Sequence, residues 1–132
     1  MKRGGIVHSE LAGLIAGLRH TETFVITDAG LPLGPDTVCV DLGYRYGEPS
    51  FLDVARTVLA EVVVEQSWVS SPVLELNAGV HAALLEMGLT PAPIDHDAFK
   101  AMARTAKFAI RTGEDTVYAN VLCQAGVPFG PS

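Results

Sequence analysis

Residues 18–32 read Leu-Arg-His-Thr-Glu-Thr-Phe-Val-Ile-Thr-Asp-Ala-Gly-Leu-Pro, and they join a strand pattern to a turn pattern in one short piece of chain. Residues 23–27 are β-branched or aromatic, which predicts a strand, whereas residues 28–32 have the composition of a turn. The strand would deliver Asp28 to its carboxyl end, where small ligands bind in open α/β sheets. Two simpler interpretations stay open: Asp28 closes the turn with its own side chain, and His20 is a solvated residue at a helix end.

Helices and strands alternate along the rest of the chain. Apolar residues at helical spacing predict helices over 9–18, 51–59, 77–87 and 95–106. Short β-prone runs predict further strands over 37–42, 62–69, 108–110 and 117–123. The expected helix caps are Ser9, Ser50 and Asp95, and residues 88–93 are predicted to be a linker. The alternation predicts a single α/β domain over 1–132, a three-layer sandwich with a mixed sheet of about six strands and helices on both faces.

The sheet is expected to be mixed because two pairs of consecutive strands lack a helix between them. These pairs are 23–27 with 37–42, and 108–110 with 117–123. Their connections are too short for a parallel crossover, so either the strands pair antiparallel or the second strand lies elsewhere in the sheet. On a strand over 117–123, the side chains of Tyr118 and Asn120 would leave the same face.

Composition and charge exclude several classes of partner. The 132-residue chain has a net charge of −6 and a pI near 5.0, and it lacks the basic cluster that nucleic-acid binding needs. No apolar run approaches the roughly 18 residues of a transmembrane helix, so no membrane partner is expected. A mean hydropathy of +0.31 with 18% charged residues predicts a homo-oligomer that buries apolar surface between subunits. We expect a cytoplasmic protein in which Cys39 and Cys123 are free thiols.

No motif indicates a nucleotide, a hydrolytic nucleophile or a metal. The chain lacks GxGxxG, GxSxG and the phosphate-binding pattern GxxxxGK followed by Ser or Thr. The histidines at positions 8, 20, 81 and 96 have no second histidine three or four residues away, and zinc sites usually show such spacing. On a helix, Asp95, His96 and Asp97 would point in different directions and could not chelate together. The sequence therefore predicts a protein without metal or cofactor.

Seven short pieces are spread from near the start of the chain to near its end: Met1-Lys2-Arg3-Gly4 with Ile6, Leu18-x-His20-Thr21, Asp28-Ala29-Gly30-Leu31-Pro32, Pro49-x-Phe51, Ile110-Arg111-Thr112-Gly113-Glu114, Tyr118-Ala119-Asn120 and Ala125-Gly126-Val127-x-Phe129. In this order they resemble the D-ribose pyranase family. Each piece alone is weak, whereas the ordered set is specific. The sister fucose mutarotase family is similar in layout but does not usually carry Asp-Ala-Gly-Leu-Pro, so the resemblance favours ribose.

The resemblance implies an isomerase that interconverts the pyranose and furanose forms of D-ribose in the cytoplasm, without a cofactor. It also implies a ring-based homo-oligomer, a decamer, with sites between subunits. His20 takes the position of the proton donor. The substrate-binding positions fall on Asp28, His96, Lys100, Tyr118 and Asn120. Segment 65–93 departs from the family pattern, which bears on the subunit contacts more than on the site.

The chemistry of ring interconversion suits these residues. The ring oxygen must gain a proton as its bond to C1 breaks, and an imidazole, with an unperturbed pKa of about 6.5, gives and takes protons near neutrality. A strand over 23–27 spans about 16 Å at ~3.3 Å per residue, so His20 and Asp28 would lie too far apart to hold one pentose. Either the chain folds back at Thr21–Glu22, or the site combines His20 of one subunit with Asp28 of the next. We favour the shared site.

Two other functions stay open at this point. A fucose-type mutarotase would use the same acid–base chemistry on a different sugar. A non-catalytic sugar-binding or regulatory protein would use Asp28, Tyr118 and Asn120 without needing a titrating histidine. The sequence also leaves Glu114 undecided between a turn acid and a supporting partner of the site.

Overall fold

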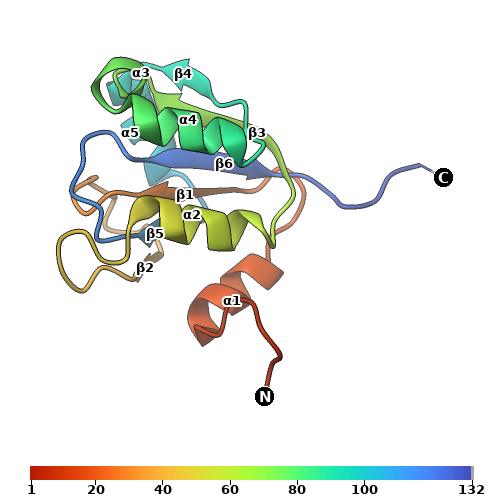
Figure 1. The fold of residues 1–132 in the computed structure, drawn as a ribbon. Helices are drawn as coiled ribbons and strands as arrows, with labels where there is room; N and C mark the ends of the chain where they lie inside the picture. Colours follow the sequence, from red (N-terminus) through yellow and green to blue (C-terminus); the bar gives the residue numbers. More distant parts are fainter. Residues whose placement is uncertain (132) are drawn as a thin grey trace.

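The computed structural model describes residues 1–131 of the chain. Its elements, in order, are α1 (Ser9–Ala16), β1 (Thr23–Thr27), β2 (Cys39–Asp41), α2 (Phe51–Leu59), β3 (Val64–Ser70), α3 (Val73–Leu76), α4 (Ala78–Glu86), β4 (Ala92–Ile94), α5 (His96–Arg104), β5 (Phe108–Arg111) and β6 (Val121–Ala125). The strands form one six-stranded sheet in the order β2-β5-β1-β6-β3-β4 (Figure 1). The expected mixed α/β sheet is confirmed.

The strands of residues 1–131 share one direction except for β6. β1, β5 and β2 pair in parallel, as do β3 and β4, whereas β6 is antiparallel to both of its neighbours, β1 and β3. The carboxyl ends of β1 to β5 therefore meet at one end of the sheet, which we call the carboxyl end, and β6 starts there. The opposite end is called the amino end. The two pairs of consecutive strands without a helix between them, β1 with β2 and β5 with β6, are not neighbours in the sheet. β5 lies between β1 and β2, and β1 lies between β5 and β6, so in each pair the second strand lies elsewhere in the sheet.

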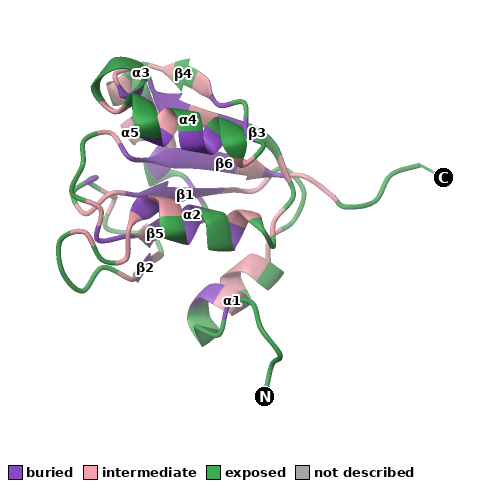
Figure 2. Ribbon diagram, in the orientation of Figure 1, coloured by how far each residue is buried: buried purple, intermediate pink, exposed green. Residues whose placement is uncertain are grey.

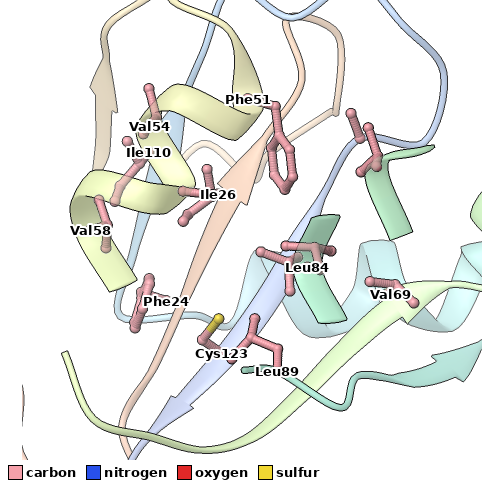
Figure 3. Packing of buried hydrophobic residues seen from close by; sticks show 14 of the residues in the cluster. Phe24, Ile26, Phe51, Val54, Val58, Val69, Leu84, Leu89, Ile110 and Cys123 are labelled. Atoms are coloured by element: carbon pink, nitrogen blue, oxygen red, sulfur yellow. The ribbon is translucent and has the colours of Figure 1, made fainter. Parts of the chain in front are cut away.

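The helices cover both faces of the sheet, as the sequence predicts. Along β1, Phe24 and Ile26 pack with the buried residues of α1, α2 and α4, including Phe51 (Figure 3). Val25 points to the other face and packs with Phe99 of α5. Figure 1 shows α2 and α4 in front of the sheet and α5 behind it, and Figure 2 shows that the central strands are the most deeply buried. Successive side chains of β1 thus alternate between two hydrophobic cores, one on each face of the sheet.

Side-chain caps set where the helices begin. Ser50 and Asp95 cap α2 and α5 as expected, each accepting hydrogen bonds from backbone N–H groups of the first turn. The prediction of Ser9 as the cap of α1 is wrong. His8 is the cap, because its Nδ1 accepts the Leu11 N–H at 3.2 Å and Ser9 is already helical.

The last strand begins later than predicted. β6 is Val121–Ala125, whereas the sequence predicts a strand over 117–123. Residues 117–120 belong to the preceding loop, where Tyr118 has φ = 57°, a left-handed conformation that a regular strand does not contain. Tyr118 and Asn120 therefore do not project from one face of a strand, and this prediction is corrected.

A short strand, β4, lies partly within the segment 88–93 that the sequence assigns to a linker. It pairs with the end of β3, from Trp68 opposite Ala92 to Ser70 opposite Ile94. β4 is the outermost strand of the sheet. Pro93 fits there because one side of an edge strand makes no ladder hydrogen bonds. Two prolines in a run of four residues hid this strand from the sequence pattern.

Candidate active site

The turn after β1 holds the Asp28 side chain at the carboxyl end of the sheet. Its Oδ1 accepts the backbone N–H groups of Gly30 at 3.0 Å and Leu31 at 2.8 Å. Asn120 Oδ1 accepts the Asp28 N–H at 2.8 Å, and Asn120 Nδ2 donates to Asp28 Oδ2 at 3.3 Å. Asp28 therefore closes the turn with one oxygen and keeps acceptor capacity on the other for a ligand.

A depression of about 280 Å³ opens beside this carboxylate. Asp28, Pro32, His96 and Tyr118 are among its lining residues. The rings of His96 and Tyr118 meet edge to face with their centroids 5.1 Å apart. His96 Nδ1 lies 2.8 Å from the hydroxyl of Ser70, a buried residue that ends β3. This contact holds the imidazole through Nδ1, and Nε2 takes no part in it. The Asp28 carboxylate, the His96 imidazole and the Tyr118 phenol thus surround one opening.

His20 lies at the amino end of the sheet, between α1 and β1. Its Nε2 is 2.9 Å from Glu65 Oε2 near the start of β3, and Gln124 at the end of β6 donates to Glu65 Oε1 at 2.6 Å. The chain does not fold back at Thr21–Glu22, since the Thr21 N–H bonds to Ala125 O at 2.9 Å, also at the amino end. Within one molecule, the length of β1 therefore separates His20 from Asp28.

Backbone strain marks both ends of the sheet. Within the part of the chain that the structure describes, two non-glycine residues have positive φ: Thr21 at 71° and Tyr118 at 57°. Such a conformation is unfavourable for any L residue and most unusual for a β-branched one. One of these residues follows His20 directly and the other lines the depression beside Asp28. Strain of this kind often accompanies functional sites, and here it adjoins both halves of the predicted one.

Comparison with known proteins then identifies the family. The profile of the RbsD / FucU transport protein family matches residues 1–128. The chain belongs to this family. Curated relatives named D-ribose pyranase include those of Exiguobacterium sibiricum, 40% identical over 98% of this chain, and Bacillus pumilus, 43% identical over 98%. D-ribose pyranase 1 of Rubrobacter xylanophilus is 44% identical over 98%, and each of the three relatives is covered completely.

Solved structures of the RbsD / FucU family share the fold. Bacillus subtilis RbsD, complexed with D-ribose, superposes with a TM-score of 0.93 at 37% identity, and covers 98% of this chain and 100% of its own. The fucose mutarotase of Streptococcus pneumoniae, in complex with L-fucose, gives a TM-score of 0.78 at 15% identity. That match covers 93% of this chain and 95% of the other. The second comparison shows the fold alone, whereas the first is close in sequence as well.

Two residues predicted from the resemblance lie beside the opening and not in its lining. Asn120 is buried at 1% exposure, and its amide is engaged with Asp28. Lys100 follows His96 by one turn of α5, and its ammonium lies 3.3 Å from Asp97 Oδ1. The carboxyl end of this RbsD / FucU family member thus brings together Asp28, His96, Tyr118 and Asn120, with Lys100 one turn away.

Sequence reasoning missed Ser70 and Glu65 and left Glu114 undecided. Glu114 accepts the Phe51 N–H at 2.9 Å through Oε1 and the Thr116 hydroxyl at 2.7 Å through Oε2, so it holds the start of α2 against the loop before β6. Ser70 directly follows the strand predicted over 62–69, and a polar residue at that position is a weak signal for a site. Glu65 carried none, because its partner His20 is 45 residues away.

Among residues 1–131, no three His, Cys, Asp or Glu side chains are grouped in a way that could ligate a metal ion. None of the helices in the same residues has the length and apolar character to cross a bilayer.

Proposed function

We propose that this chain is a D-ribose pyranase, an isomerase that interconverts the pyranose and furanose forms of D-ribose in the cytoplasm. Relatives with this name share 40–44% identity with nearly the whole chain, and RbsD, which superposes closely, was solved with D-ribose. The observation that carries the proposal is the depression at the carboxyl end of the sheet, where Asp28, His96 and Tyr118 converge. Polar groups of these three kinds bind sugar hydroxyls and offer an aromatic surface to the ring.

The reaction moves protons and leaves the sugar's composition unchanged. Opening breaks the bond between C1 and the ring oxygen, the ring oxygen gains a proton, and the anomeric hydroxyl loses one to give the aldehyde. Closure through a different hydroxyl reverses these transfers and yields the other ring size. Each step needs only a proton donor and an acceptor, and general acid–base catalysis supplies roughly 10²–10⁴-fold. We assign the donor to His20, with His96 as a hydroxyl ligand or assisting base.

The substrate-binding set comprises Asp28, His96, Lys100, Tyr118 and Asn120. Asp28 Oδ2 accepts from sugar hydroxyls, because Oδ1 is occupied by the turn. Asn120 acts mainly by holding that carboxylate in place. Lys100 reaches the sugar from the next turn of α5 when its contact with Asp97 opens.

The proposed site is shared between two copies of the chain. His20 and Asp28 lie at opposite ends of β1, so His20 of one copy would meet Asp28 of its neighbour. Exposed apolar side chains support association, since Val7, Leu76 and Phe129 are 77%, 64% and 76% exposed. We extend the proposal to a ring-based decamer on the family resemblance, and sedimentation of the purified protein tests the subunit number.

Exchange NMR on D-ribose tests the activity. Saturation of a pyranose anomeric signal should transfer to the furanose signals faster when the protein is present, and a His20→Ala variant should lose this acceleration. Binding without faster exchange would instead favour a sugar-binding or regulatory protein. The same measurement on L-fucose separates a pyranase from a fucose-type mutarotase, because only the preferred sugar should respond strongly at equal protein concentration.

Subunit exchange tests the shared site. His20→Ala and Asp28→Ala proteins should each be inactive, and a mixture should regain activity as subunits redistribute, because some interfaces then combine an intact His20 with an intact Asp28. The matched control mixes two preparations of His20→Ala, which should stay inactive. No recovery, with exchange verified by mass spectrometry of differently labelled subunits, would overturn sharing.

A further inference from the structure

The imidazole of His20 is held by a carboxylate from a distant strand. His20 Nε2 and Glu65 Oε2 are 2.9 Å apart, and Gln124 Nε2 donates to the other carboxylate oxygen at 2.6 Å. The other acid at this turn is already engaged, because Glu22 Oε1 accepts from the Arg19 N–H at 2.6 Å and from Lys107 Nζ at 2.8 Å. Glu65 is therefore the carboxylate that serves His20.

The backbone around Glu65 is built to aim this side chain. The register between β3 and β6 shifts between Val64, opposite Ala125, and Gln66, opposite Gln124, so Glu65 is the extra residue of a bulge. Bulges bend a strand and redirect side chains, and they are common beside active sites. Gly126 leaves room for it, since a Cβ at position 126 would lie 3.2 Å from the Cβ of Glu65.

The charge state of Glu65 decides the direction of its hydrogen bond. Donors from Gln124 and His20 hold the pKa of the Glu65 carboxyl below its ordinary value. An ionised carboxylate only accepts hydrogen bonds, so Nε2 of His20 must carry the proton in this contact. In the neutral imidazole, the other nitrogen, Nδ1, then has the free lone pair.

We propose that Glu65 is a positioning residue for His20, which fixes the Nε2–H tautomer and leaves Nδ1 to exchange the proton with the sugar. The proposal rests on the proposed function of His20. In the protonated imidazole, Nδ1–H gives its proton to the ring oxygen as the bond to C1 breaks. The neutral ring that remains is the Nε2–H tautomer. On closure its Nδ1 takes the proton of the hydroxyl that attacks C1, which restores the donor.

Glu65→Gln tests the tautomer directly and without sugar. The amide can accept from or donate to the ring, so it no longer enforces one tautomer. In protein labelled with ¹⁵N-histidine, at a pH where the ring is neutral, His20 should show a predominant Nε2–H pattern that shifts toward a mixture in Glu65→Gln. The His20 signals are identified by their absence in His20→Ala. Glu61→Gln is the matched control, since Glu61 bonds to the Ile6 N–H and should leave the pattern unchanged.

The kinetic arm follows ribose ring exchange in the same variants. Glu65→Gln should lower kcat by roughly tenfold or more, within the total of about 10²–10⁴ that acid–base catalysis supplies. KM should change little, because in this proposal Glu65 acts through His20. Gln124→Met, which removes only the donor to Glu65, should lower kcat in the same direction by a smaller factor. It also keeps the test informative if Glu65→Gln fails to fold.

The outcomes separate this proposal from the proposed function. An unchanged tautomer in Glu65→Gln, or a loss confined to KM, would overturn the positioning role. A predominant Nδ1–H pattern in the unmodified protein would overturn it as well. If the unmodified protein does not accelerate ribose exchange, the pyranase proposal fails, while the tautomer measurement still decides whether Glu65 fixes the ring.

Discussion

Asp28 and Asn120 hold each other through two hydrogen bonds, although they lie 92 residues apart in the sequence. The Asn120 amide oxygen accepts from the Asp28 backbone, and its nitrogen donates to the Asp28 carboxylate. Asn120 is buried directly before β6, so the position of the carboxylate depends on the strand beside β1 as well as on its own turn. Such prior orientation lowers the entropic cost of binding a sugar.

Two substitutions of Asp28 should distinguish its role in closing the turn from its role in binding the sugar. Asp28→Asn keeps an oxygen for the N–H groups of Gly30 and Leu31, so its free energy of unfolding should fall less than that of Asp28→Ala, by about 1 kcal/mol. Both variants should bind ribose more weakly, because the charged acceptor is lost. Urea unfolding and ribose titration by NMR measure the two effects. Equal stability of the two variants would contradict the role of Asp28 in closing the turn.

The positive φ of Thr21 should lower the stability of the fold while it helps to place the adjacent His20. Glycine adopts φ = 71° without the cost of about 1–2 kcal/mol that an L residue bears there, but it adds about 0.5–1 kcal/mol of chain entropy. Thr21→Gly should therefore raise the free energy of unfolding by up to about 1.5 kcal/mol and slow ribose exchange as the turn loosens. Thr21→Ala is the control, because it removes the same side chain but keeps the unfavourable φ. A comparable gain in both variants would refute strain as the cause.

Acid should weaken the turn that carries His20. The Lys107 ammonium, followed by the Arg19 N–H, holds the pKa of the Glu22 carboxyl below its ordinary value of 4.5. Because the folded protein binds this proton less tightly than the unfolded chain, the stabilisation is complete above the ordinary value and disappears as pH falls through the folded pKa. Glu22→Gln should thus be less stable than the unmodified protein at pH 7, with a difference that shrinks toward pH 3. Urea midpoints at fixed protein concentration test this, with Glu75→Gln, an exposed acid, as control.

Both cysteines should be poor nucleophiles in the folded protein. They are free thiols, as the sequence predicts. Burial raises the pKa of Cys123 to about 12 and also raises that of the half-buried Cys39. With Ellman's reagent at pH 8, Cys39 should react slowly and Cys123 only after unfolding in guanidinium. Rapid release of two equivalents from native protein would show that the strands around Cys123 open readily.

Local patterns predicted the elements whose signals lie within a few residues. The run at 23–27 and the capped starts of α2 and α5 became a strand and two helices because cap, periodicity and composition agreed. The loop at 117–120 was missed because Val117 and Tyr118 favour strands, while the tertiary structure holds Tyr118 in a left-handed conformation. The order of the strands could not be predicted, since it depends on pairings between distant segments.

The candidate site likewise contains residues that the local sequence indicates and residues that only contacts between distant segments place. Asp28, His96 and Tyr118 could be proposed from turn chemistry and family resemblance, and the fold brings them together at one opening. Glu65 could not be proposed, because a bulge in β3 and a contact across 45 residues place it beside His20. Contacts of this kind appear only when the sheet is assembled.

The single reversed strand has a consequence for how this protein tolerates change. Asn120 precedes β6 and Gln124 lies near its far end, so the three residues between them set the spacing between the support of Asp28 and the support of Glu65. An insertion or deletion between these two residues would shift one support relative to the other and change the side-chain alternation along β6. We therefore expect length differences among homologues to accumulate in the connections around α3 and α4 and to spare β6.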